Sequence, residues 1–191
     1  MLGRRDDPFG MIVFSLPAAG DDRPVSDTRC EVRPARDGDA DAVAELAAGL
    51  AWSFEFSPDS FRRNYPALLA SGDACLLLAT DGPDALGYLL GFTHLTFFAD
   101  GPVGWVEEVF VRDTERGGGV GRALMDAFES WAAGRDCALV ALATRRAAPF
   151  YRALGYEESA VYFRKLLADP VRTRLTSQPV QGDGGGPGLL L

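Results

Sequence analysis

The chain has few of the side chains that bind metals or cross-link a fold. Its 191 residues include three cysteines and one histidine, and Cys30, Cys75 and Cys137 stand singly, without a Cys-x-x-C pair. This pattern excludes the common zinc-site spacings and a disulfide framework. We therefore expect free thiols, no bound metal and a cytoplasmic protein.

Long apolar runs and excess positive charge are also missing. The apolar run at residues 11–16 is too short to span a membrane, and no basic region with a cleavage site frames it as a signal peptide. The formal net charge is −8, and Lys165 is the only lysine. Because nucleic-acid binding depends on basic residues that neutralise phosphates, we expect neither a nucleic-acid partner nor a membrane association. The negative charge suits a cationic substrate instead.

The composition predicts one domain between two tails. Hydrophobic residues make up 47% of the chain, which is enough for one sizeable core. Prolines, glycines and aspartates interrupt any period in residues 1–28, and residues 169–191 are rich in glycine and proline. We expect a disordered leader, a folded domain over residues 29–168 and a disordered tail.

Hydrophobic periodicity predicts the secondary structure between these ends. Strands are expected at residues 30–33, 74–80, 86–96, 103–111, 139–143 and 159–167. Helices are expected after a cap at Asp37, after Ser57 and Pro58, from Val120 to a stop at Gly134, and at residues 149–154.

The most informative stretch is residues 109–123, where an apolar strand leads through an arginine- and glycine-rich loop into an amphipathic helix. A helix N-terminus has unsatisfied amide donors, and glycines let an anion approach them, so the loop is typical of a phosphate site. The spacing fits neither a Walker loop nor a dinucleotide-binding fingerprint. It fits R-x-x-G-x-G, as Arg116, Gly119 and Gly121. The alternative is a glycine-rich turn that binds nothing.

A second motif follows the glycine-rich loop along the chain. It is the segment AAPFYRALGYEE at residues 147–158. Together the two motifs resemble the GNAT superfamily of acetyl-CoA-dependent N-acetyltransferases, and among these the diamine and small-amine acetyltransferases, over residues 30–168. The resemblance implies a single α/β domain whose central sheet is mixed, mostly antiparallel, flanked by helices and splayed at the acetyl-CoA site. It also implies a homodimer.

The resemblance assigns the cofactor-binding residues. The loop would bind the CoA pyrophosphate, and the end of the preceding strand would pair with the pantetheine arm. Tyr151 would protonate the departing thiolate. The family often has Asn where this chain has Thr144, so the polar contact to CoA at that position stays open. The implied cofactor contacts are Val109, Phe110, Val111, Arg116, Gly117, Gly118, Gly119, Val120, Gly121, Thr144 and Tyr151.

The chemistry needs a base as well, because an alkyl ammonium must lose a proton before it attacks a thioester. A strict strand period of two places Glu107 on one face with Val109 and Glu108 on the other with Val106, so only one glutamate faces the amine. The family pattern favours Glu107 over Glu108 as the catalytic base. His94 is a minor candidate.

Acceptor recognition is expected between the first two helices, where Trp52 and Phe54 stand beside Glu55. Aromatic rings with a carboxylate suit an ammonium group, although the rings could equally seal the core. Together with Glu107 and His94 they form the predicted substrate site. The leading hypothesis is acetylation of a small amine or amino-acid derivative. Acetylation of protein N-termini or lysines, and a non-catalytic acyl-CoA-binding regulatory domain, are the alternatives.

Overall fold

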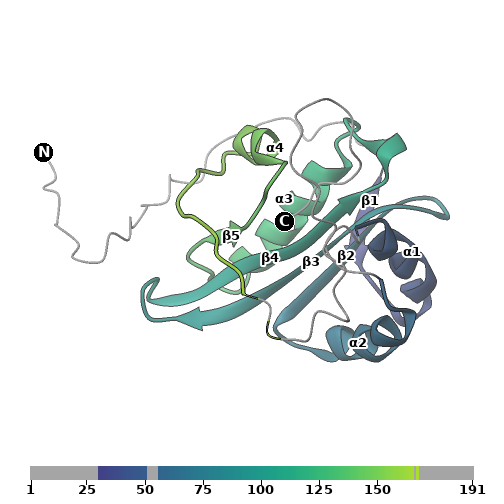
Figure 1. The fold of residues 1–191 in the computed structure, drawn as a ribbon, viewed down its shortest axis with the longest axis horizontal. Coiled ribbons are helices and arrows are strands. Elements are labelled where there is room, and N and C mark those ends of the chain that lie inside the picture. Colours follow the sequence, from purple (N-terminus) through teal and green to yellow (C-terminus); the bar gives the residue numbers. More distant parts are fainter. Residues whose placement is uncertain (1–29, 51–55, 166, 168–191) are drawn as a thin grey trace, which may run out of the picture.

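The computed structural model describes residues 30–50, 56–165 and 167 (Figure 1). Its five strands form one open sheet in the order β1-β2-β3-β4-β5, in which only the β4–β5 pair is parallel. This confirms the predicted mostly antiparallel α/β architecture. The strands are β1 Glu31–Pro34, β2 Ala74–Asp81, β3 Asp84–Thr96, β4 Gly101–Val111 and β5 Val140–Leu142. The helices are α1 Ala40–Leu50, α2 Pro58–Ala70, α3 Val120–Ala133 and α4 Ala148–Ala153, with 3-10 turns at Asp37–Asp39 and Asp113–Glu115.

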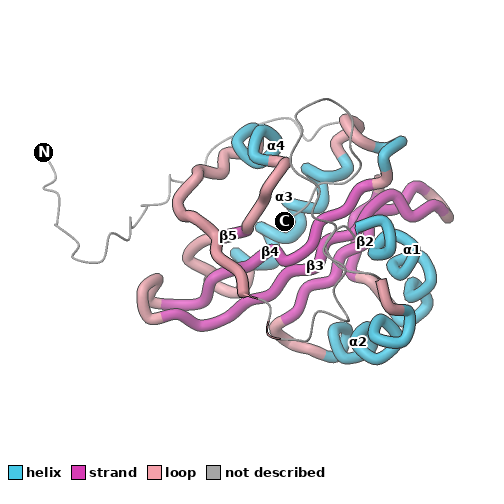
Figure 2. Tube along the Cα trace, in the orientation of Figure 1, coloured by secondary structure: helices cyan, strands magenta, loops and turns pink. Residues whose placement is uncertain are grey.

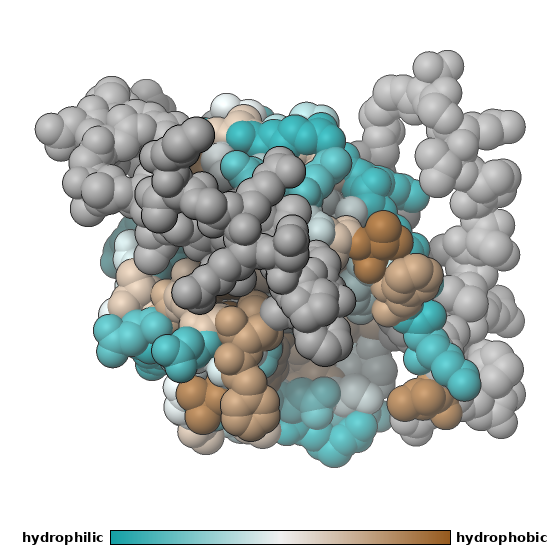
Figure 3. Space-filling view, turned by 90° about the vertical axis from the view of Figure 1, so that its left-hand side faces the viewer, coloured by the Kyte–Doolittle hydropathy of each residue, from teal (hydrophilic) through white to brown (hydrophobic). Residues whose placement is uncertain are grey.

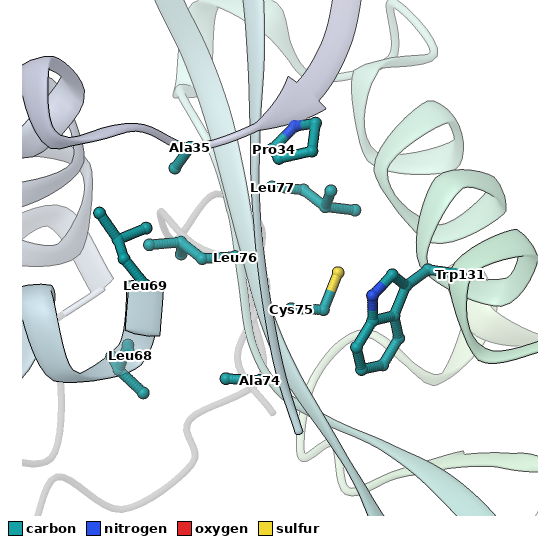
Figure 4. Close-up of a pocket in the computed structure, with 9 residues that line it drawn as sticks. All are labelled: Pro34, Ala35, Leu68, Leu69, Ala74, Cys75, Leu76, Leu77 and Trp131. Carbon is teal, nitrogen blue, oxygen red and sulfur yellow. The ribbon is translucent and has the colours of Figure 1, made fainter. Parts of the chain in front are cut away.

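Helices cover both faces of the sheet. Figure 4 shows the sheet nearly edge-on, with Leu68 and Leu69 of α2 on one side and Trp131 of α3 on the other. One core cluster lies on the α3 face around Phe128, and the second lies on the α1/α2 face around Leu46 and Tyr88. At the end of β1 the two faces meet at an apolar cavity of about 140 Å³. Side chains of β2, β3 and β4 therefore belong to one core cluster or the other, according to the helix that packs over them.

The helix boundaries follow local capping chemistry. Ser57 caps α2 by accepting a hydrogen bond from the Ser60 amide, with Pro58 in the first turn, and α3 ends at Gly134, both as predicted. The first helix differs from the prediction, because α1 begins at Ala40 after a 3-10 turn that starts at Asp37.

The last predicted strand is wrong in the described part of the chain. Residues 156–165 form neither helix nor strand, and they run beyond α4 as a loop in Figure 2. A strand needs a neighbour that pairs with its backbone, and β5 is only three residues long and half-buried rather than buried. The segment therefore has no strand to pair with in the described part of the chain, and Tyr162 and Phe163 are exposed.

The β3–β4 hairpin projects from the rest of the sheet (Figure 2). Its tip carries exposed apolar side chains: Leu95 is 83% exposed, Phe97 fully exposed and Phe98 52% exposed. On the face toward which the hairpin points, hydrophobic residues stand in small groups among hydrophilic ones (Figure 3). Exposed apolar patches of this kind can mark surfaces of interaction.

The described residues bear on the expectations about membrane spans, metal sites and cysteines. None of their helices is long and apolar enough to cross a membrane, and they contain no cluster of three or more His, Cys, Asp or Glu side chains suited to a metal ion. Cys30, Cys75 and Cys137 are free thiols, and burial raises the pKa of Cys75 to about 12. The predicted leader and tail lie outside the described residues.

Candidate active site

The sheet opens between β4 and β5. These strands pair only from Gly104 with Val140 to Val106 with Leu142. Beyond Val106, β4 continues to Val111 while β5 has ended, so one edge of residues 107–111 has no neighbouring strand in the described part of the chain. Unpaired backbone groups at a sheet edge can bind an extended ligand. The opening lies at Val109, Phe110 and Val111, where the family resemblance implies the pantetheine arm.

The glycine loop lies at the end of this open edge, between β4 and α3. Gly117 and Gly119 have φ values of 80° and 88°, in the left-handed region that glycine adopts without strain, and Gly119 is the N-cap of α3. Arg116 forms a salt bridge of 2.5 Å with Asp113. The loop leads directly into the N-terminus of α3, where the first amides of a helix have no intrahelical acceptor.

Gly121 has a packing role that the motif does not reveal. A Cβ atom added there would lie 3.2 Å from Phe150 Cζ, so the absence of a side chain lets α3 approach α4 closely. Two further contacts hold α4 and the residues after it against α3: Arg122 donates to the Ala153 carbonyl, and the hydroxyl of Tyr156 donates to Glu129 at 2.7 Å. Burial raises the pKa of Glu129. The first turn of α3 therefore packs directly against α4.

Tyr151 lies on α4 and is 3% exposed. Its hydroxyl is buried without a hydrogen-bond partner in the described part of the chain, and burial raises its pKa, which keeps the phenol protonated at neutral pH. Its ring contacts Phe150 and Tyr156, and it belongs to the core cluster of Val109 and Val111 on the α3 face. An orphaned hydroxyl beside the open edge of β4 fits the role of proton donor to a bound thiolate.

Thr144 lies in the turn between β5 and α4. Its hydroxyl accepts a hydrogen bond of 3.1 Å from the Ala147 amide, so it shapes the entry into α4. Contact of Thr144 with CoA stays a prediction.

A β-bulge in β4 decides where the glutamates lie. Near the hairpin tip Gly91 pairs with Val106, but the next pair is Leu90 with Glu108, so β4 has one extra residue at Glu107. A bulge shifts the alternation of side chains along its strand. Accordingly Val106 and Val109, which strict alternation would separate, both face α3.

The sequence expectation that Glu107 and Glu108 lie on opposite faces of the strand is therefore wrong. Glu108 accepts a hydrogen bond of 2.6 Å from the hydroxyl of Tyr88, a core residue of the α1/α2 face. Glu107 accepts one of 2.9 Å from the Trp105 indole, and Trp105 pairs with Phe92, which packs on the same face. Since paired residues of adjacent strands share a face, both carboxylates lie on the α1/α2 side.

The two carboxylates differ in environment. Glu107 is exposed and lines a cavity of about 50 Å³ between β4 and β5, together with Trp105, Val106, Ala143 and Tyr162. Glu108 is mostly buried, and its burial raises the pKa of its carboxyl. The Tyr88 hydrogen bond opposes this rise and the nearby Glu107 charge adds to it. Glu108 and Tyr151 therefore approach the open edge of β4 from opposite faces of the sheet.

The remaining predicted residues lie elsewhere. His94 is exposed and pairs with Val103 near the hairpin tip, roughly 13 Å along β4 from Glu107 at the usual strand rise. Trp52, Phe54 and Glu55 lie outside the described residues. Sequence reasoning missed Tyr88, whose only signal would have been the register of β3 against β4.

Comparison with known proteins gives the family. The model of the acetyltransferase (GNAT) family matches residues 44–156, which is more than half of the chain and contains the open edge, the glycine loop and Tyr151. The chain belongs to this family. It is therefore an acyltransferase, and it uses acetyl-CoA.

Aminoglycoside acetyltransferases are among the similar proteins. The GNAT chain is 32% identical to aminoglycoside N(6')-acetyltransferase type 1 of Stenotrophomonas maltophilia, over 71% of this chain and 93% of that protein. It is similar in structure to aminoglycoside antibiotic 6'-N-acetyltransferase AAC(6')-IG of Acinetobacter haemolyticus, with 25% identity, a TM-score of 0.61 and coverage of 72% and 99%. AAC(6')-Iy in complex with a bisubstrate analogue, CoA-S-monomethyl-acetylneamine, shares the fold, with 20% identity, a TM-score of 0.63 and coverage of 72% and 98%.

Proposed function

We propose that this GNAT acetyltransferase transfers the acetyl group of acetyl-CoA to a primary amine of a small cationic molecule. The observation that carries the proposal is the β4 bulge, which brings Glu107 and Glu108 to one face beside the open edge. Two carboxylates at the mouth of an acetyl site favour an ammonium group by charge. Acceptors with several amines, such as aminoglycosides or diamines, fit this pair best, and the 32% identity to an aminoglycoside acetyltransferase supports them.

In this mechanism the glutamates on the α1/α2 face of the sheet act on the amine, and Tyr151 on the α3 face acts on the sulfur. Exposed Glu107 attracts the ammonium group, and Glu108 takes one of its protons, which leaves a neutral amine with a free electron pair. Acetyl-CoA supplies the electrophilic carbonyl carbon, at which the new C–N bond forms and the C–S bond breaks. Tyr151 gives its proton to the departing sulfur and recovers one from the nitrogen, so the sum is amide, free thiol and one released proton.

The sequence favoured Glu107 as the base, and the environments now favour Glu108. A carboxylate base works best when its pKa approaches the working pH, and burial raises the pKa of Glu108. Glu107 is exposed and bonded to Trp105, an arrangement that suits binding more than proton transfer.

An amine panel tests the substrate class. The purified chain is incubated with acetyl-CoA and one of four acceptors, and free thiol is followed: neamine, 1,4-diaminobutane, an amino-acid amide, or a peptide with a free N-terminus. Thiol release with the first three, and little with the peptide, supports the proposal. Turnover of the peptide alone would favour the protein-acetylating alternative, and no turnover of the three small amines would overturn the proposal.

The glycine loop makes a separate prediction. In Gly119→Asp an added carboxylate lies at the N-cap of α3, where the pyrophosphate would bind. We expect acetyl-CoA binding to weaken by at least about 2 kcal/mol, measured by calorimetry, as for the loss of charged hydrogen bonds. Gly119→Asn is the matched control, because Asn has the same shape and a similar tolerance of the left-handed φ of 88° but no charge. Equal affinities in the wild type and Gly119→Asp would remove the loop from the CoA site.

We also infer that the active protein is a cytoplasmic homodimer. The exposed apolar side chains at the hairpin tip, Leu95, Phe97 and Phe98, supply a surface that a second copy could cover. The free thiols of Cys30, Cys75 and Cys137 are compatible with a reducing compartment.

A further inference from the structure

Tyr88 is the residue of this site that no sequence motif indicated. It lies on β3 with 1% of its surface exposed, inside the core cluster of the α1/α2 face. Its hydroxyl donates a hydrogen bond of 2.6 Å to Glu108 Oε2. A buried phenol usually has a hydrogen-bond partner, and the partner of Tyr88 is a carboxylate at the open edge rather than a backbone carbonyl.

The hydrogen bond depends on the bulge. Beyond the bulge Leu90 pairs with Glu108 and Tyr88 with Phe110, so Tyr88 is a diagonal neighbour of Glu108 on the same face. Diagonal neighbours lie within reach of an aromatic side chain. A continuous ladder would have paired Tyr88 with Val109 and turned Glu108 to the other face. The same extra residue therefore places the carboxylate and supplies its partner.

The contact leaves half of the carboxylate available. Tyr88 occupies Oε2, whereas Oε1 accepts no hydrogen bond within the described residues. A phenol that donates to one oxygen fixes the rotation of the carboxylate and stabilises its charged form. Oε1 then remains available to accept a proton, with the carboxylate held in one orientation.

Few other charges of the described residues act on this carboxylate. Among residues 30–50 and 56–165, Glu107 of the same strand is the other ionisable group that affects the pKa of Glu108, and it opposes ionisation. On α1, Glu45 forms a salt bridge with Arg112 beyond the end of β4, and on α2 the Asp59–Arg62 pair is exposed. Tyr88 is thus the group that favours the ionised form.

We propose that Tyr88 is a positioning residue for acetyl transfer, which holds the Glu108 carboxylate ready to receive the proton of the amine. The proposal rests on the proposed function, in which Glu108 is the base. It adds a residue from a neighbouring strand whose effect is exerted through Glu108 and not through contact with substrate.

The pH profile of Tyr88→Phe tests this role. Loss of the hydrogen bond removes the influence that lowers the pKa of Glu108, so the pKa rises and the acidic limb of kcat with neamine moves to higher pH. We expect a shift of about one pH unit, equivalent to about tenfold in rate on that limb, since a hydrogen bond to a charged group is being lost. At alkaline pH the variant should approach wild-type turnover. An unmoved limb overturns the proposal.

Tyr65→Phe is the matched control. Tyr65 is a buried phenol of the same core cluster, and its hydroxyl donates to the Arg36 carbonyl at 2.7 Å instead of a carboxylate. Its loss should leave the acidic limb in place. A similar shift in both variants would mean that the effect comes from loosening of the core.

Two further measurements separate the possible failures. In a Glu108→Gln background, Tyr88→Phe should cause no additional loss of turnover, and an additional loss would show that Tyr88 acts by another route. The Glu108 carboxyl can also be titrated by ¹³C NMR without any amine. If its pKa rises in Tyr88→Phe while no amine is acetylated, the proposed function fails and the contact stands. If its pKa is unchanged, the Tyr88 proposal fails, whatever the activity.

Discussion

Tyr151→Phe is expected to lower turnover by roughly ten- to a thousandfold while acetyl-CoA affinity changes little. The variant loses the only proton that the side chain can give to the departing sulfur, and general acid catalysis contributes about two to four decades, part of which water can replace. Stopped-flow measurement of thiol release gives the rate, and calorimetry gives the affinity. Wild-type turnover, under conditions where chemistry limits the rate, would remove Tyr151 from the mechanism.

The same variant should be at least as stable as the wild type. The hydroxyl of Tyr151 is buried without a partner in the described residues, and a buried unsatisfied hydroxyl costs about 1–3 kcal/mol. Tyr156→Phe is the matched comparison, because the hydroxyl of Tyr156 donates to Glu129 and its loss leaves a half-buried carboxyl without this partner. Thermal unfolding should show Tyr151→Phe at or above the wild-type Tm and Tyr156→Phe below it. A clear loss of stability in Tyr151→Phe would mean that the hydroxyl has a structural partner.

The features that the sequence predicted are those determined over a few neighbouring residues. The glycine loop is an example: Gly117 and Gly119 need left-handed backbone, and the apolar spacing that follows defines α3 up to Gly134. The order of the elements up to α4 also agrees, because caps and turns are local, and the mostly antiparallel sheet is the one that the family resemblance implies. Cofactor contacts at these residues remain predictions.

The features that it missed depend on the register between strands. Strict alternation of side chains along β4 does not allow for the extra residue at Glu107. That residue is evident only from how Gly91 and Leu90 pair across the hairpin. One inserted residue was enough to move a glutamate to the other face. Tyr88 was overlooked for the same reason, and the strand at residues 159–167 was predicted from its pattern without a partner to pair with.

Glu108→Gln should cause the largest loss of activity among the substitutions at the amine side. The amide keeps the size of the carboxyl and can still accept the hydrogen bond of Tyr88, so the fold is retained, but it cannot take a proton. We expect kcat to fall by about two to four decades below the pKa of the amine. Raising the pH should restore part of the rate, because more of the amine is then already neutral.

Glu107→Gln should affect a different kinetic parameter from Glu108→Gln. If the exposed carboxylate attracts the ammonium group without taking its proton, its loss raises KM for cationic amines and changes kcat little, as for an interaction made equally in the ground and transition states. Neamine, with several ammonium groups, should lose more affinity than a monoamine. The opposite division, with a large fall in kcat for Glu107→Gln and a normal pH profile for Glu108→Gln, would make Glu107 the base, as the sequence pattern alone favoured, and Glu108 a structural partner of Tyr88.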